Sequence, residues 1–177
     1  MNLPNAITIG RILLIPVFLV YALKDSDAAS VVAFVVFLVA SLSDSLDGYL
    51  ARRSNTISRM GQFLDPTADK LLIGAALVAL VIEEDFPLWV ALLIAFREIA
   101  VQILRTQIVR GGGDLPSSAA GKLKTVLQIV MVCWWLLPWD GTNLGHHVLV
   151  AAVLLSALWS GVEYFVKAQR VREVTPG

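Results

Sequence analysis

Six apolar stretches, each close to the length of a helix that crosses a lipid bilayer, dominate this sequence. A membrane-spanning α-helix needs about 20 mostly apolar residues. The stretches are residues 5–22, 28–51, 66–82, 86–110, 119–139 and 146–169, and only short polar or glycine-rich segments separate them. We therefore expect an all-α integral membrane protein, with six transmembrane helices in one bundle that forms a single domain over residues 1–177.

The composition agrees with this expectation. Hydrophobic residues make up 57% of the chain and charged residues only 16%, and the mean hydropathy is +0.74. A soluble domain of this size carries about 25% charged residues. The first apolar stretch carries Arg11 and lacks a cleavage site of small residues, so we interpret it as a retained helix and not as a signal peptide.

The charges are distributed unevenly, although the formal net charge is zero. If both termini lie on one side of the membrane, that side or its approach holds every lysine and arginine except Lys24. The opposite side then holds six acidic residues, which are Asp25, Asp27, Glu83, Glu84, Asp85 and Asp140. Because cytoplasmic segments are enriched in Lys and Arg, both termini are expected in the cytoplasm.

Four aspartates interrupt the apolar pattern, at Asp44, Asp47, Asp65 and Asp69. Within each pair the spacing is three or four residues, which places both positions on one side of a helix. Carboxylates with no nearby histidine or cysteine are hard oxygen ligands, which favour Mg²⁺, Mn²⁺ or Ca²⁺ over zinc or copper. Two such ions would balance four negative charges and suit phosphoryl transfer. The Asp65-Pro66 pair also predicts a helix that begins at this point.

The spacing of the motif resembles the signature of the CDP-alcohol phosphotransferase family. Its fixed positions are matched at Asp44, Asp47, Gly48, Ala51, Arg52, Gly61, Asp65 and Asp69. The resemblance implies six transmembrane helices around a polar cavity that faces the cytoplasm. It also implies transfer of a phosphatidyl group from CDP-diacylglycerol to an alcohol, with release of CMP.

Site roles follow from the same resemblance. The four aspartates are expected to bind two Mg²⁺ or Mn²⁺ ions, and Asp69 is also the expected general base. The cytidine and pyrophosphate pocket is expected to involve Gly48, Ala51, Arg52 and Gly61, together with Asn5 and Thr8 from the first helix. Alternatively, Asn5, Thr8 and Arg11 cap the helix and extend to the membrane interface.

Three further segments resemble the phosphatidylglycerophosphate synthase branch of that family: NLPNAITIGRILLIPVF, REIAVQILR and GKLKTVLQ. This implies sn-glycerol 3-phosphate as the acceptor, whose phosphate needs cations. The candidates are Arg105, Arg110, Lys122 and Lys124. The two lysines are equally explained as topology determinants. Arg97 with Glu98 predicts a polar cluster inside the bundle, with an acceptor role for Arg97 as the alternative.

The family implies a homodimer in a bacterial cytoplasmic membrane, in contact with lipids, with its active site facing the cytoplasm and no nucleic-acid partner. Two alternatives stay open. The first is the same chemistry with inositol phosphate, phosphatidylglycerol or serine as the acceptor. The second is a small cation carrier, which predicts polar residues across the whole bilayer, whereas here they lie in one half.

Overall fold

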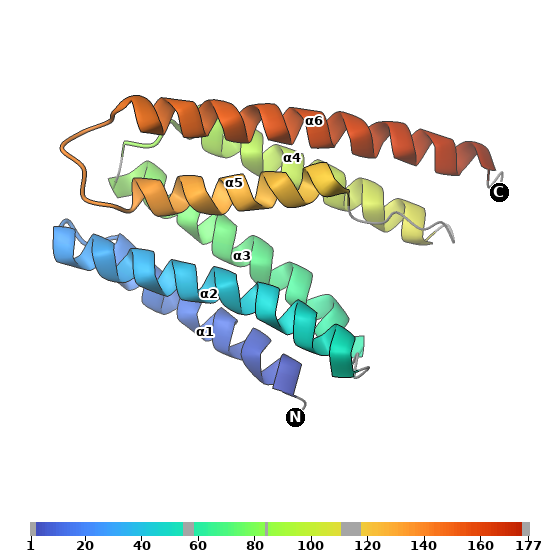
Figure 1. Ribbon diagram of the computed structural model, residues 1–177, viewed down its shortest axis with the longest axis horizontal. Coiled ribbons are helices and arrows are strands. Elements are labelled where there is room, and N and C mark those ends of the chain that lie inside the picture. Colours follow the sequence, from blue (N-terminus) through green and yellow to red (C-terminus); the bar gives the residue numbers. More distant parts are fainter. Residues whose placement is uncertain (1–2, 55–58, 84, 111–117, 175–177) are drawn as a thin grey trace. The chain divides into compact units, whose positions relative to one another are not determined.

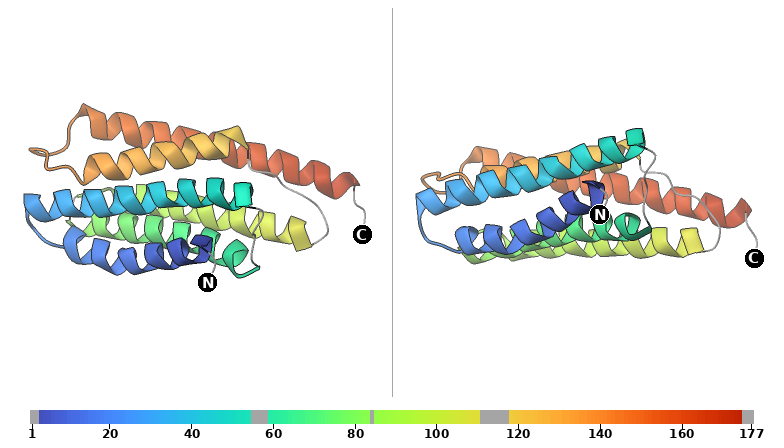
Figure 2. Two further views of the ribbon diagram at one scale, coloured as in Figure 1. Left: turned by 60° about the horizontal axis from the view of Figure 1, so that its bottom comes forward. Right: turned by 90° about the horizontal axis from the view of Figure 1, so that it is seen from below.

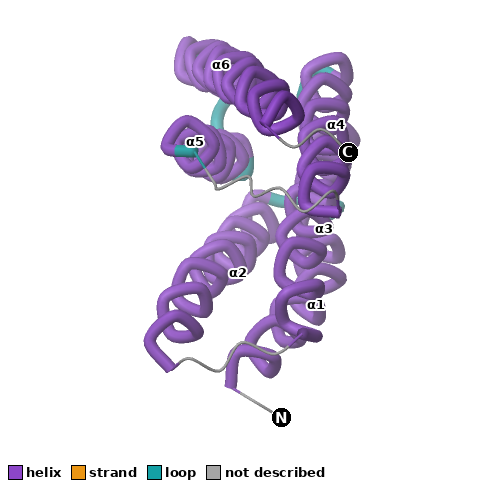
Figure 3. Tube along the Cα trace, turned by 90° about the vertical axis from the view of Figure 1, so that its right-hand side faces the viewer, coloured by secondary structure: helices purple, strands orange, loops and turns teal. Residues whose placement is uncertain are grey.

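The computed structural model describes residues 3–54, 59–83, 85–110 and 118–174, and it describes side-chain surroundings for residues 8–43, 68–83, 85–109 and 118–169. Within these ranges the regular structure is helical and no strand occurs (Figure 3). The helices are α1 Leu3–Ala22, α2 Asp27–Ser54, α3 Arg59–Glu83, α4 Leu88–Arg110, α5 Ala119–Trp135 and α6 Leu144–Val174 (Figure 1). The predicted all-α class and the six helices are confirmed.

The chain divides into two compact units. The first contains residues 1–86 and 132–141, and therefore α1, α2, α3 and the end of α5. The second contains residues 87–131 and 142–177, and therefore α4, most of α5 and α6.

In the first unit, α1 contacts both α2 and α3, and α2 also contacts α3. The chain reverses between α1 and α2, so these two helices run in opposite directions (Figure 2). The rings of Phe18 and Phe37 lie 5.7 Å apart between them. Ala33, Ala40 and Ala76 are fully buried, and such small side chains let helix backbones approach closely.

Two pairs of aromatic rings involve the end of α5 in this unit. The Phe86 ring meets the Trp135 ring edge-on at 4.8 Å, and the Trp134 and Trp139 rings stack at 4.6 Å. The indole Nε1 of Trp139 donates a hydrogen bond to the Trp134 carbonyl at 2.9 Å. Helix α5 ends at Trp135, short of the expected residue 139, because Pro138 has no N–H with which to continue it.

The start of α3 corrects one expectation. The Asp65-Pro66 pair was expected to begin the helix, but α3 already begins at Arg59 and passes through Pro66. A proline removes one backbone donor, and membrane helices tolerate this where neighbouring groups compensate. Asp65 and Asp69 therefore both lie inside one continuous helix.

In the second unit, α4 contacts α6, and the two helices run in the same direction. Arg97 of α4 reaches Ser160 of α6, and further along both helices Ile108 packs in one cluster with Tyr164 and Ala168. The contacts occur in the same order along both helices, which agrees with their parallel arrangement. The beginning of α5 belongs to the same unit.

Helix α6 has the clearest membrane-spanning character among the described helices. Its segment Leu144–Gln169 is 26 residues long with a mean hydropathy of 1.8, so by length and composition it can cross a membrane. Two shorter apolar segments are Thr8–Ala22 and Asp27–Ser43. Six separate membrane crossings therefore stay a prediction.

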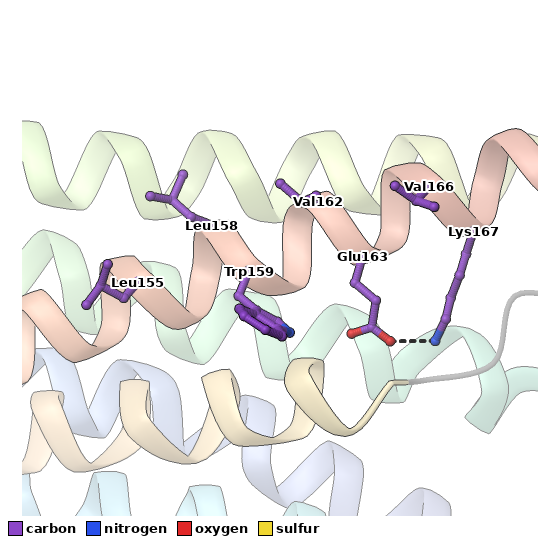
Figure 4. Close-up of a pocket in the computed structure, with 7 residues that line it drawn as sticks. All are labelled: Leu155, Leu158, Trp159, Val162, Glu163, Val166 and Lys167. Atoms are coloured by element: carbon purple, nitrogen blue, oxygen red, sulfur yellow. Dashed lines mark hydrogen bonds and ion pairs between the residues drawn. The ribbon is translucent and has the colours of Figure 1, made fainter.

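One face of α6 is a shallow apolar groove (Figure 4). It is lined by Leu155, Leu158, Trp159, Val162 and Val166, with Glu163 and Lys167 at one end. The Lys167 ammonium donates to the Glu163 carboxylate at 2.6 Å, one helical turn away. The paired charges and the apolar side chains suit a helix that passes from hydrocarbon toward a headgroup layer.

Candidate active site

The four aspartates lie on two helices that contact each other. Asp44 and Asp47 are in α2, and Asp65 and Asp69 are in α3. Asp69 is half-buried and follows the fully buried Ala68. The side chains of the other three aspartates lie outside the described residues, so the metal-ligand set stays a prediction.

Most of the expected nucleotide-binding positions also lie outside the described side chains, namely Asn5, Gly48, Ala51, Arg52 and Gly61. Thr8 is the exception, and it is fully buried in α1. Arg11, three residues later, is only 1% exposed. The structure therefore places both side chains in the interior of the first unit, which argues against the alternative that they extend to the membrane interface.

The second unit contains a partly buried polar cluster, which we call the Glu98 cluster. Its members are Arg97, Glu98, Lys124 and Ser160. The Arg97 Nη1 donates to Glu98 Oε1 at 3.0 Å, and its Nη2 donates to the Ser160 hydroxyl oxygen at 2.7 Å. The Lys124 ammonium binds the same oxygen of Glu98. The Ser160 hydroxyl in turn donates to the Ser156 carbonyl at 2.8 Å. The predicted polar cluster around Arg97 and Glu98 is confirmed, and it joins α4 to both α5 and α6.

The Glu98 cluster is positively charged and incompletely hydrogen-bonded. Two cations and one carboxylate leave a net charge of +1 on these groups. Among the described residues, the buried Nε of Arg97 and the buried Nε2 of Gln128 have no hydrogen-bond partner. Gln128 lies one turn after Lys124 on α5. Because buried donors nearly always find acceptors, this interior is suited to a further anionic or hydroxylic group.

The four cations expected to bind the acceptor phosphate fall into different environments. Arg105 and Lys122 are exposed, whereas Lys124 is only 3% exposed and paired with Glu98. The side chain of Arg110 lies outside the described residues. The Lys124 pair with Glu98 was not anticipated, because the two residues lie on different helices.

The first turn of α5 has a defined N-cap, which the sequence reasoning did not single out. The Ser118 hydroxyl oxygen accepts the N–H of Gly121 at 3.0 Å, the usual geometry for a serine that caps a helix. The Ser118 backbone N–H donates to the Tyr164 hydroxyl oxygen at 3.4 Å. The signal was present in the sequence, since Ser118 directly precedes the helix-forming pair Ala119 and Ala120.

Comparison with known proteins gives consistent matches along the chain. The family model described as CDP-alcohol phosphatidyltransferase matches residues 1–159. A probable phosphatidylglycerophosphate synthase of Mycobacterium tuberculosis (strain H37Rv) is 40% identical over 173 residues, which cover 96% of this chain and 82% of the relative. The CDP-diacylglycerol–glycerol-3-phosphate 3-phosphatidyltransferase of Bacillus subtilis (strain 168) is 38% identical over 186 residues, covering 94% of each chain. The protein of the same name from Salmonella paratyphi A is 37% identical over 176 residues, covering 95% of each chain.

Proposed function

Because this chain belongs to the CDP-alcohol phosphatidyltransferase family, we propose that it transfers the phosphatidyl group of CDP-diacylglycerol to sn-glycerol 3-phosphate. The products are phosphatidylglycerophosphate and CMP, which places the enzyme in phospholipid biosynthesis. One observation carries the proposal: relatives named for this reaction match nearly the whole chain, and the Bacillus subtilis protein is covered over 94% of its length.

The proposed architecture is one membrane domain of six transmembrane helices with both termini in the cytoplasm, assembled as a homodimer in a bacterial cytoplasmic membrane. Three observations support the membrane domain. The structure has six helices within its described residues, and the family match extends over parts of both compact units. In addition, if both termini lie on one side, that side or its approach holds every lysine and arginine except Lys24.

For the chemical step we propose that Asp44, Asp47, Asp65 and Asp69 hold two Mg²⁺ or Mn²⁺ ions. The donor set fits these metals because it consists of carboxylates alone. The two aspartates of each helix share one side of that helix, and the two helices contact each other. Divalent ions bound there would neutralise the pyrophosphate of the donor substrate. Asp69 would accept the proton of the attacking hydroxyl group, which requires a carboxylate within hydrogen-bond reach of it.

The nucleotide half of the donor substrate is assigned to Gly48, Ala51, Arg52 and Gly61, with Asn5 and Thr8. Small residues allow a ligand to approach a helix backbone closely. For the acceptor phosphate we propose Arg105, Arg110, Lys122 and Lys124. Exposure makes Arg105 and Lys122 accessible from outside the bundle, whereas Lys124 would act from within its pair with Glu98.

The test is CMP release by the purified protein in detergent, with CDP-diacylglycerol and Mg²⁺. Glycerol 3-phosphate is compared with inositol phosphate, phosphatidylglycerol and serine, and a chelator serves as the control. We expect chelator-sensitive CMP formation with glycerol 3-phosphate alone. Turnover with another acceptor would contradict the acceptor assignment, and a lack of turnover with every acceptor would contradict the enzymatic function.

A further inference from the structure

Tyr164 of α6 packs against the second half of α4. Its side chain is buried, with 7% of the residue exposed. It forms one apolar cluster with Ile108 of α4 and Ala168 of α6, and Val101 and Leu104 pack against this cluster. The ring therefore covers the side of α4 that carries Leu104 and Ile108. Arg105 directly follows Leu104 in the sequence.

The same side chain also contacts the first turn of α5. Its hydroxyl oxygen accepts the Ser118 N–H at 3.4 Å. A Cβ atom added to Gly121 would lie 3.4 Å from Cε2 of the ring and 3.6 Å from the hydroxyl oxygen. An added Cβ atom would thus be in ordinary van der Waals contact with the ring, which shows that the ring lies directly over the capped turn.

In each of the two segments that contact Tyr164, the next residue along the chain is an exposed cation. Arg105 follows Leu104 on α4, and Lys122 follows Gly121 on α5. Both cations are exposed, whereas their neighbours in the contact with Tyr164 are buried or half-buried. All these groups belong to the second compact unit. The distance between the two cations therefore depends on how α4 and α5 are held against this ring.

We propose that Tyr164 is a positioning residue for the acceptor substrate. It holds in place the helical turns that carry Arg105 and Lys122, and these two cations bind the acceptor phosphate. The inference rests on the proposed function, because it takes the acceptor to be a phosphate ester. A phosphate bound by two cations loses affinity when either cation is displaced, since the strength of charge-assisted hydrogen bonds depends on their geometry. Tyr164 itself does not touch the acceptor; it acts through the two helices.

The test compares Michaelis constants of the full-length protein in detergent for the wild type, Tyr164→Phe and Ser118→Ala. The first variant removes only the hydroxyl group of Tyr164. The second removes the serine hydroxyl that caps α5 and also bonds to Glu163, while the backbone N–H of residue 118 can still donate to Tyr164. Tyr21→Phe is the matched control, because Tyr21 lies on α1 in the other compact unit. We expect the KM for glycerol 3-phosphate to rise about threefold to fivefold in both test variants, the loss expected for one neutral hydrogen bond. The KM for CDP-diacylglycerol and the values for the control should stay at wild-type levels.

Three results would overturn the inference. The first is an unchanged KM for glycerol 3-phosphate in folded Tyr164→Phe, and the second is an equal rise in both Michaelis constants, which indicates a general structural role. If Tyr164→Phe has a lowered melting temperature, both Michaelis constants are measured below that temperature, and the same two results decide. The third is a wild-type protein that does not use glycerol 3-phosphate; this overturns the proposed function as well and is visible before any variant is compared.

Discussion

At the scale of single residues, the carboxylates of this chain occur in two different environments. Asp69 is half-buried in a helix that also carries Asp65, whereas Glu98 is bound by two cations from different helices. Both Arg97 and Lys124 bind Oε1 of Glu98, so this carboxylate already links α4 to α5. We therefore assign different roles to the two carboxylates: Asp69 belongs to the proposed chemistry, and Glu98 contributes to the packing of the second unit.

Replacement of Asp69 by asparagine should reduce CMP formation at least 100-fold, which is the lower end of the contribution of a general base. Much of the affinity for CDP-diacylglycerol should remain, because three other carboxylates are left at the proposed site. Both quantities are measured on the purified variant, by CMP release and by equilibrium binding. Asp85→Asn is the matched control, since Asp85 is exposed and has a φ of 49°, a conformation that asparagine adopts readily. Loss of all donor-substrate binding in Asp69→Asn would indicate a mainly structural role.

Replacement of Glu98 by glutamine should lower the stability of the protein by about 1 to 2 kcal/mol, because the buried Lys124 and the half-buried Arg97 lose their charged acceptor. Thermal unfolding in detergent measures the effect. The control is Glu83→Gln, because Glu83 is an exposed glutamate at the end of α3, where a substitution should change stability little. Equal unfolding temperatures for Glu98→Gln and the wild type would mean that the Glu98 cluster does not hold α4 and α5 together.

At the scale of elements, α6 combines an outward apolar face with inward polar contacts. The groove residues from Leu155 to Val166 face outward, while Ser160 and Tyr164 on the same helix bond to α4 and α5. Such a division is expected of a helix that contacts lipid on one side and its own bundle on the other.

A charge introduced at the middle of the outward face tests this division. Leu158→Arg places a guanidinium near the centre of the segment Leu144–Gln169, where it costs about 2.5 to 3.5 kcal/mol for insertion. The fraction of protein that resists carbonate extraction from membranes should fall. Leu144→Arg, at the end of the segment and also exposed, should leave that fraction unchanged. If both variants insert like the wild type, the face does not contact hydrocarbon.

At the scale of the whole molecule, the orientation in the membrane decides whether the proposed site has access to soluble substrates. Glycerol 3-phosphate is a charged, water-soluble metabolite, so its binding site must open to the compartment that contains it. In the proposed topology, the side of the two termini holds every lysine and arginine except Lys24, and the four aspartates lie in the half of the membrane nearest to that side.

The proposed orientation predicts which positions a membrane-impermeant maleimide modifies in spheroplasts. With Cys133 replaced by serine, Asp140→Cys should react in intact spheroplasts, because Asp140 is exposed and the proposed topology places it on the side opposite the termini. Gly177→Cys should react only after permeabilisation. The reverse pattern would place the termini and the aspartates outside the cytoplasm.

The amino-acid sequence alone determined the helical class, the six helices and the family, because helix length, hydrophobicity and the spacing of a motif are local properties. The expected start of α3 at Asp65 and Pro66 was wrong, since neighbouring groups in a folded chain let a helix pass through a proline. Only the tertiary structure decided the partners of the polar side chains. Lys124 and Glu98 are 26 residues apart, and Ser118 and Tyr164 are 46 apart. Such pairs depend on which helices meet and in which rotation, and this is set by packing over the whole unit and not by any local pattern.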